Sequence, residues 1–129
     1  MSSDSFPALG LIGFSVALSV SGQLVLKIGV GKLATIEAFT VFSFGEFLRQ
    51  ALFNPVILLG FALYAVSAAL WLVVLSRLEL SYAYPFLALN FVLLTVFSRV
   101  VLSETIPTLR WIGILFICVG IMLVARSGR

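Results

Sequence analysis

Histidine is absent from the 129 residues of the sequence, and cysteine occurs once, as Cys118. These two residue types provide most zinc ligands and many catalytic nucleophiles, so their scarcity argues against both kinds of site. A single cysteine also excludes an intrachain disulfide framework. We expect no metal, no cofactor and no enzymatic activity, because no nucleophile stands in a pattern with a general base.

Charged residues are also scarce. They make up 10% of the chain, against about a quarter in a typical soluble domain. Hydrophobic residues make up 62%, and the mean hydropathy is +1.24. The net charge of +3 is too small and too scattered to indicate nucleic-acid binding. This composition predicts a membrane protein that forms one small domain over residues 1–129.

Four apolar runs are long enough to cross a hydrocarbon core, which takes about 20 helical residues. They cover residues 8–28, 55–76, 80–101 and 107–125. Backbone groups in lipid must be paired within the chain, so we predict an all-α fold of four transmembrane helices. The flank before the first run carries Asp4 and no basic residue, so this run is predicted to be a permanent span rather than a signal peptide.

The connections between the runs differ in length. The second, around residues 77–79, is so short that spans two and three must form an antiparallel hairpin. Within span three, Pro85 is expected to kink the helix and to free a carbonyl one turn earlier. In the long first connection, residues 43–53 show a helical apolar pattern and begin with a candidate capping box, Ser43 and Glu46. We expect either an interfacial amphipathic helix or a loop packed on the bundle.

Orientation in the membrane stays open, because basic residues bias it only weakly. Three lie on each side of the predicted bundle when Lys27 and Arg99 are set aside as parts of helix ends. Counting both gives five against three and places the first and third connections in the cytoplasm. Arg110 and Trp111, near the start of span four, are interpreted as interfacial anchors.

A polar stripe runs along span one. Ser15, Ser19, Gln23 and Lys27 recur every four residues and therefore share one helix face. Lys27 and Arg99 lie near the ends of two parallel spans, so they are expected at a similar depth, where two cations can hold a phosphate. The alternative is that each reaches separately to anionic lipid. Ser15 is expected to serve packing, whereas the amide of Gln23 needs partners.

All five acidic residues lie outside the apolar runs, so no acid within a span is expected to neutralise Lys27 or Arg99. Span two places Trp71 on one face with Tyr64 and Ser67. Span three carries Tyr84 and Asn90, and a buried asparagine needs hydrogen-bond partners. In span four, Gly113 and Gly120 share a face suited to close helix approach, which we assign to a subunit interface in preference to internal packing.

The order and spacing of several short motifs resemble one family. They are SVSGQL at 19–24 with Lys27, LWL at 70–72, AYP at 83–85, LNF at 89–91, Glu104 and GILFICVG at 113–120. Together they resemble the small multidrug resistance branch of the drug/metabolite transporter superfamily, and most closely its small flippase subunits for aminoarabinose-phosphoundecaprenol. The similarity covers nearly the whole chain outside residues 35–54.

The resemblance departs from the multidrug exporters at two positions. Ser19 stands where they carry a glutamate, and Leu87 stands where they carry a tryptophan after the tyrosine that corresponds to Tyr84. Without a membrane-embedded acid, proton exchange for a cationic drug is poorly supported.

The resemblance implies a flippase for an anionic polyprenyl-phosphate-linked sugar in the bacterial inner membrane. The phosphate is expected near Lys27 and Arg99, with the sugar along Ser19, Gln23, Trp71, Tyr84 and Asn90. An antiparallel dimer, homomeric or heteromeric, is implied, and transport is expected to be driven by consumption of the lipid on the far side. The alternatives are a proton-coupled multidrug exporter and a non-transporting membrane scaffold subunit.

Overall fold

The computed structural model describes residues 5–33 and 41–127, which form helices and connecting segments without a β-strand. The helices are α1 (Ser5–Gly31), α2 (Val41–Phe53), α3 (Pro55–Arg77), α4 (Leu80–Leu87), α5 (Leu89–Val101) and α6 (Thr108–Ser127). Within these residues, four stretches are helical, long and apolar enough to cross a membrane: α1, α3, α4 with α5, and α6. The prediction of an all-α fold with four spans is therefore confirmed. The ends of the predicted spans agree with the helix ends to within three residues.

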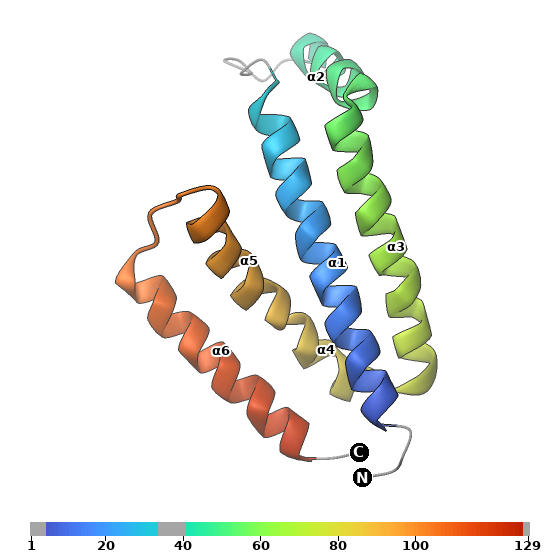
Figure 1. Ribbon diagram of the computed structural model, residues 1–129, viewed down its shortest axis with the longest axis vertical. Coiled ribbons are helices and arrows are strands. Elements are labelled where there is room, and N and C mark those ends of the chain that lie inside the picture. The colour runs from blue at the N-terminus through green and yellow to red at the C-terminus, as the bar shows by residue number, and fades with distance from the viewer. Residues whose placement is uncertain (1–4, 34–40, 128–129) are drawn as a thin grey trace.

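The four spans alternate in direction and form two parts of a bundle (Figure 1). α1 and α3 lie side by side, and α2 crosses at their upper end. α4 and α5 continue from the lower end of α3, and α6 returns beside them. The upper end of α1 therefore faces the segment that joins α5 to α6.

Glycines allow α1 and α3 to pack closely. A Cβ atom added to Gly22 would lie 2.9 Å from the carbonyl oxygen of Gly60, and one added to Gly60 would lie 2.7 Å from Cγ of Leu26. A Cβ on Gly29 would lie 2.7 Å from Cγ1 of Ile57. Small residues that let helix backbones approach are typical of membrane helix pairs. The glycines that bring two helices together are thus on α1 and α3.

A buried serine pair joins the same two helices. Ser15 Oγ donates to the carbonyl oxygen of Ser67 at 3.1 Å, and Ser67 Oγ donates to the carbonyl oxygen of Ser15 at 2.9 Å. Both residues are buried. Because each hydroxyl is satisfied on the facing helix, Ser15 serves helix packing, as expected, by a bond between helices rather than within its own helix.

The third span breaks close to its proline. α4 ends at Leu87, Ala88 separates it from α5, and the Ala88 N–H donates to the carbonyl oxygen of Pro85 at 3.0 Å. The tight three-residue bond replaces the usual four-residue helical bond at this point. The interruption of the third span expected from Pro85 is therefore present, and it falls three residues after the proline.

α2 presents a partly covered apolar face. Phe47 and Ala51 are half-buried, whereas Phe44, Leu48 and Leu52 are exposed. This confirms a helix in the first connection, and its location at the membrane interface stays a prediction. The helix begins at Val41, so Ser43 lies inside the first turn and the predicted capping box is wrong.

The Glu46 carboxylate of α2 has partners on its own helix. Arg49 donates to it through Nη2 at 2.8 Å and through Nε at 3.1 Å, and Gln50 donates at 3.1 Å. These bonds, that from Arg49 above all, lower the pKa of Glu46 from its ordinary value. Glu46 is therefore held ionised on the exposed polar side of α2.

The connection from α5 to α6 contains one strained residue. Ser103 has φ 54°, which makes it the one non-glycine residue with positive φ among those that the structure describes. A residue with a Cβ atom is strained in this left-handed region, whereas glycine adopts it readily.

Replacing Ser103 with glycine should raise the free energy of unfolding by about 0.5–1 kcal/mol, because glycine removes the Cβ clash at this φ. Titration of detergent-solubilised protein with SDS, followed by circular dichroism, measures the change. Ser103→Ala keeps the Cβ atom and should leave stability close to that of the native chain. Loss of stability in both variants would instead assign the Ser103 hydroxyl a stabilising contact.

Candidate functional site

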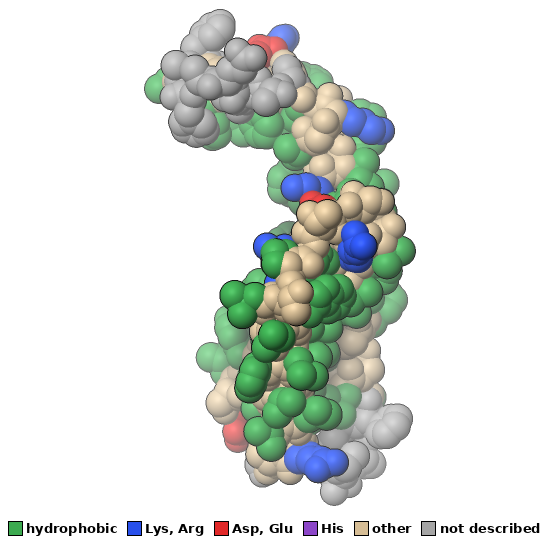
Figure 2. All heavy atoms as spheres, turned by 90° about the vertical axis from the view of Figure 1, so that its left-hand side faces the viewer, with side chains coloured by type: hydrophobic (Ala, Val, Ile, Leu, Met, Phe, Trp, Pro, Cys, Tyr) green, Lys and Arg blue, Asp and Glu red, His purple; other side chains and the backbone are tan. Residues whose placement is uncertain are grey.

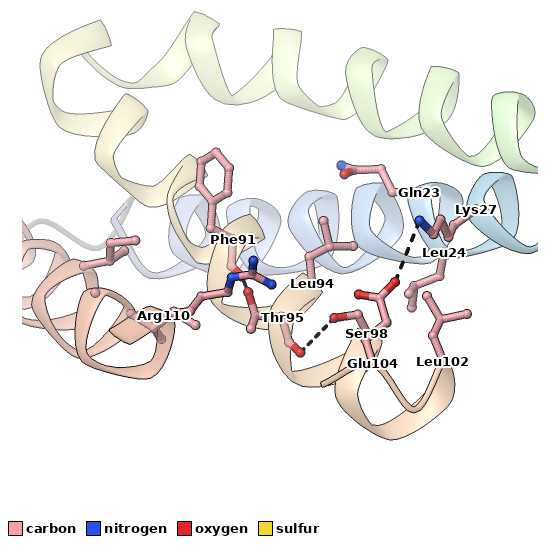
Figure 3. Close-up of a pocket in the computed structure, with 13 residues that line it drawn as sticks. Gln23, Leu24, Lys27, Phe91, Leu94, Thr95, Ser98, Leu102, Glu104 and Arg110 are labelled. Carbon is pink, nitrogen blue, oxygen red and sulfur yellow. Dashed lines mark hydrogen bonds and ion pairs between the residues drawn. The ribbon is translucent and has the colours of Figure 1, made fainter. Parts of the chain in front are cut away.

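A cavity of about 610 Å³ opens between α1, α5 and α6 (Figure 3). The polar side chains on its wall are Gln23, Lys27, Thr95, Ser98, Glu104 and Arg110, and the rest of the lining is apolar apart from Gly113. Thr95 and Ser98 donate their hydroxyl protons to carbonyl oxygens of their own helix, at 2.7 and 3.1 Å. The charged groups among these lining residues are Lys27, Arg110 and Glu104.

Lys27 reaches into the cavity from α1 and meets Glu104. Their Nζ and Oε1 atoms are 3.8 Å apart, and the side chains are 65% and 40% exposed (Figure 3). The expectation that no span carries an acid to neutralise Lys27 holds, since Glu104 follows the end of α5. A carboxylate nevertheless reaches the lysine, because the α5–α6 connection lies opposite the upper end of α1.

Arg110 is the second cation on the cavity wall, on the first turn of α6. Figure 3 shows its side chain reaching toward Thr95 on α5. It forms no hydrogen bond or ion pair with the part of the chain that the structure describes. The interpretation of Arg110 as an interfacial anchor stays a prediction, and the structure also places this residue on the cavity wall. An uncompensated cation in a cavity of a membrane protein is a candidate for ligand binding.

Arg99 lies outside the residues that line this cavity. Its side chain is exposed, and Nη1 donates to the backbone carbonyl oxygen of Glu104 at 3.2 Å. The structure thus places Lys27 and Arg110 on the wall of one cavity, whereas Arg99 does not line it. Arg99 instead anchors the connection that carries Glu104.

A second cavity, of about 280 Å³, lies between α1, α3, α4 and the start of α5. Four of the predicted site residues line it: Ser19, Trp71, Tyr84 and Asn90. The rings of Trp71 and Tyr84 meet edge to face with centroids 6.3 Å apart. Asn90 Oδ1 is buried and has no hydrogen-bond partner among the described residues. Since buried polar atoms are normally paired, this oxygen is available to a donor on a ligand.

Gln23 connects the two cavities. It lines the larger one, and its amide Nε2 donates to Ser19 Oγ, on the wall of the smaller one, at 3.1 Å. The predicted stripe on α1 therefore divides: Lys27 and Gln23 serve the first cavity, and Ser19 serves the second. Its fourth member, Ser15, is held by Ser67.

Gly113 and Gly120 are exposed, and a Cβ atom at either would meet nothing within 4 Å. They therefore do not mediate close packing within the described part of the chain. Gly113 also lines the larger cavity. Their role in a subunit interface stays a prediction.

Apolar side chains cover much of the face shown in Figure 2, whereas charged groups gather near its middle and its ends. α6 contributes large exposed residues to the surface, namely Leu109, Ile112, Leu115, Phe116, Val119, Met122 and Leu123. Exposure on this scale is unusual for a monomer in water and is expected for helices in lipid. The chain is therefore a multi-pass membrane protein whose helices form two cavities with some polar side chains on their walls.

Comparison with known proteins identifies relatives of this class. The chain is 33% identical over 115 residues to a probable 4-amino-4-deoxy-L-arabinose-phosphoundecaprenol flippase subunit ArnE of Serratia proteamaculans, covering 89% of this chain and 96% of the relative. It is 36% identical over 112 residues to the protein with the same description in Salmonella paratyphi C, covering 85% and 89%. No family model and no solved structure matches the chain.

A third relative is more similar over a shorter stretch. The chain is 41% identical over 71 residues to the Pseudomonas fluorescens protein with that description, and the match spans 54% of this chain and 62% of the relative. The Serratia and Salmonella matches extend over nearly the full length of both chains. The chain therefore belongs to the family of ArnE small flippase subunits.

Proposed function

We propose that the chain is a subunit of a flippase that moves a polyprenyl-phosphate-linked sugar across the bacterial inner membrane. The observation that carries the proposal is the pair of cations, Lys27 and Arg110, on one cavity of a chain in this family. Among the described residues that line this cavity Glu104 is the single acid, so positive charge is in excess there. Such a cavity favours an anion and disfavours the cationic drugs of a multidrug exporter.

The phosphate is assigned to Lys27 and Arg110. An ammonium supplies a compact charge, and a guanidinium supplies a planar set of donors that fits phosphate oxygens. The polyprenyl tail is assigned to the lipid outside the helices, because a hydrocarbon chain keeps an apolar environment there. Arg99, predicted from the sequence as the second phosphate ligand, acts in this proposal by holding the Glu104 backbone.

The sugar is assigned to the smaller cavity. Trp71 and Tyr84 offer aromatic surface, Ser19 a hydroxyl, and Asn90 Oδ1 an unpaired acceptor for a hydroxyl or amine of the headgroup. The proposal places one lipid headgroup across both cavities, with the Gln23–Ser19 bond between them.

The proposal includes a second small subunit, since four helices enclose little volume alone. The open α6 face around Gly113 and Gly120 is the proposed contact with a copy of this chain or a similar subunit, in an antiparallel pair. With no acid inside a span to exchange protons, consumption of the lipid on the far side drives net transport.

Binding of farnesyl phosphate to the purified full-length chain in detergent tests the phosphate site, with farnesol as the uncharged control. Lys27→Ala should weaken binding of farnesyl phosphate by about tenfold or more, and Arg110→Ala by several-fold, because each removes a charge-assisted contact. Lys32→Ala is the matched control, since Lys32 is an exposed cation outside the cavity. Unchanged affinity in Lys27→Ala, or equal affinity for farnesol in the native chain, would rule out this site.

A further inference from the structure

The backbone at Glu104 is fastened to the end of α5. Its N–H donates to the carbonyl oxygen of Ser98 at 3.2 Å, and its carbonyl oxygen accepts from Arg99 at 3.2 Å. Ser103 just before it adopts φ 54°, which turns the chain back over α5. Strained residues that persist near a site are commonly held there by their surroundings. None of these contacts involves the carboxylate, so the Glu104 side chain can change position while its backbone stays in place.

The carboxylate itself is held loosely. Its separation of 3.8 Å from Lys27 Nζ is too long for a hydrogen bond, and both side chains are partly exposed. The carboxylate forms no hydrogen bond and no other ion pair within the residues that the structure describes. Exposed ion pairs with this geometry contribute little, so a competing anion can separate them at low cost.

A carboxylate and a phosphate offer a lysine the same chemistry, namely anionic oxygen acceptors. Glu104 and Lys27 both line the cavity that we assign to the phosphate. If both anions stayed, the phosphate would share Lys27 with a like charge a few ångströms away, which is unfavourable. Arg110, by contrast, has no acidic partner in the described chain to give up.

We propose that the Glu104 carboxylate occupies the position of the substrate phosphate at Lys27 when no lipid is bound, and that the phosphate displaces it. This inference rests on the proposed function of the cavity. Glu104 then acts as a built-in competitor. The apparent affinity for the phosphate is proportional to the fraction of molecules in which Lys27 is free of Glu104. The carboxylate returns to the lysine as the lipid leaves. A site that must release its lipid after transport benefits from such a competitor, because the carboxylate offers Lys27 a partner as the phosphate leaves.

The test compares Glu104→Gln with the native chain in the farnesyl phosphate titration. Glutamine keeps the shape but removes the charge, so affinity should rise by about two- to fivefold, the factor that corresponds to an exposed ion pair. Glu79→Gln is the matched control, because Glu79 is an exposed acid at the turn between α3 and α4, outside the cavity. In a Lys27→Ala background, Glu104→Gln should bring no gain, since the two residues act as a pair.

The outcomes separate this inference from the function on which it rests. Equal or weaker binding by Glu104→Gln, with binding still lost in Lys27→Ala, would overturn the displacement and leave the phosphate site standing. Full binding by Lys27→Ala would overturn both. Glu104→Ala provides a second variant. Both variants are first checked for a native gel-filtration profile. A gain in Glu104→Ala supports displacement, and a loss in this variant contradicts it.

Discussion

Replacing Gly22 with alanine should destabilise the chain by about 1–3 kcal/mol, the usual cost of adding a methyl group to a tightly packed interface. The new Cβ would lie 2.9 Å from the Gly60 carbonyl oxygen and 3.1 Å from the Tyr64 nitrogen. Both of these are backbone atoms of α3, so no side-chain rotation can relieve the contact. The helices must move apart, and the measurement is again SDS unfolding followed by circular dichroism.

Gly13→Ala provides the control on the same helix. A Cβ at Gly13 would meet nothing within 4 Å, and alanine is the better helix former. This variant should be as stable as the native chain or slightly more stable. Equal stability of Gly22→Ala and Gly13→Ala would show that α1 and α3 are not held at the separation described here.

The packing of α1 on α3 matters for the site because α1 carries one wall of both cavities. Ser19 contributes to the smaller cavity, and Gln23 and Lys27 to the larger one. Gly22 lies among these residues on the side toward α3. Separation of the helices would therefore move the polar residues of α1 relative to Trp71 on α3. Gly22→Ala is therefore expected to weaken the binding of farnesyl phosphate as well as to lower the stability of the chain.

The sequence predicts the spans well because lipid allows few structures. An apolar run of about 20 residues must be helical to pair its backbone groups, and short connections then fix the direction of neighbouring helices. The same reasoning indicated that Lys27, Gln23 and Asn90 need partners, since polar groups at membrane depth are costly. The structure places all three on cavity walls.

The sequence does not predict how residues from different helices combine. The residue type of Arg110 and its place near the start of span four are typical of an interfacial anchor. Its place on the cavity with Lys27 follows only from the position of α6 beside α5. Glu104 belongs to a connection, and its approach to Lys27 depends on the backbone turn at Ser103. Spacing along one helix likewise singled out Gly113 and Gly120, whereas the close contact between α1 and α3 uses Gly22 and Gly60. Each case depends on a distance between two helices, and the spacing of residues along one helix does not predict that distance.

Asn90→Leu should lower transport of the lipid-linked sugar by about tenfold or more while leaving the fold at least as stable. Asn90 Oδ1 is buried without a partner in the described residues, and an unpaired buried acceptor costs about 1–3 kcal/mol. Leucine fills a similar volume and removes that cost, so SDS unfolding should require more denaturant. Transport should fall because the headgroup loses its acceptor in the smaller cavity.

Two measurements assign the effect to the sugar. Arrival of the sugar in the outer leaflet is followed in spheroplasts by its oxidation with a membrane-impermeant reagent, and Ser21→Ala is the control. Ser21 is exposed and donates to the carbonyl of its own helix at Ala17, so this variant should transport normally. Binding of farnesyl phosphate, which carries no sugar, should be unchanged in Asn90→Leu because Asn90 lies outside the larger cavity. A less stable Asn90→Leu chain that transports normally would show instead that Asn90 is a packing residue, and would leave the smaller cavity without a role in headgroup binding.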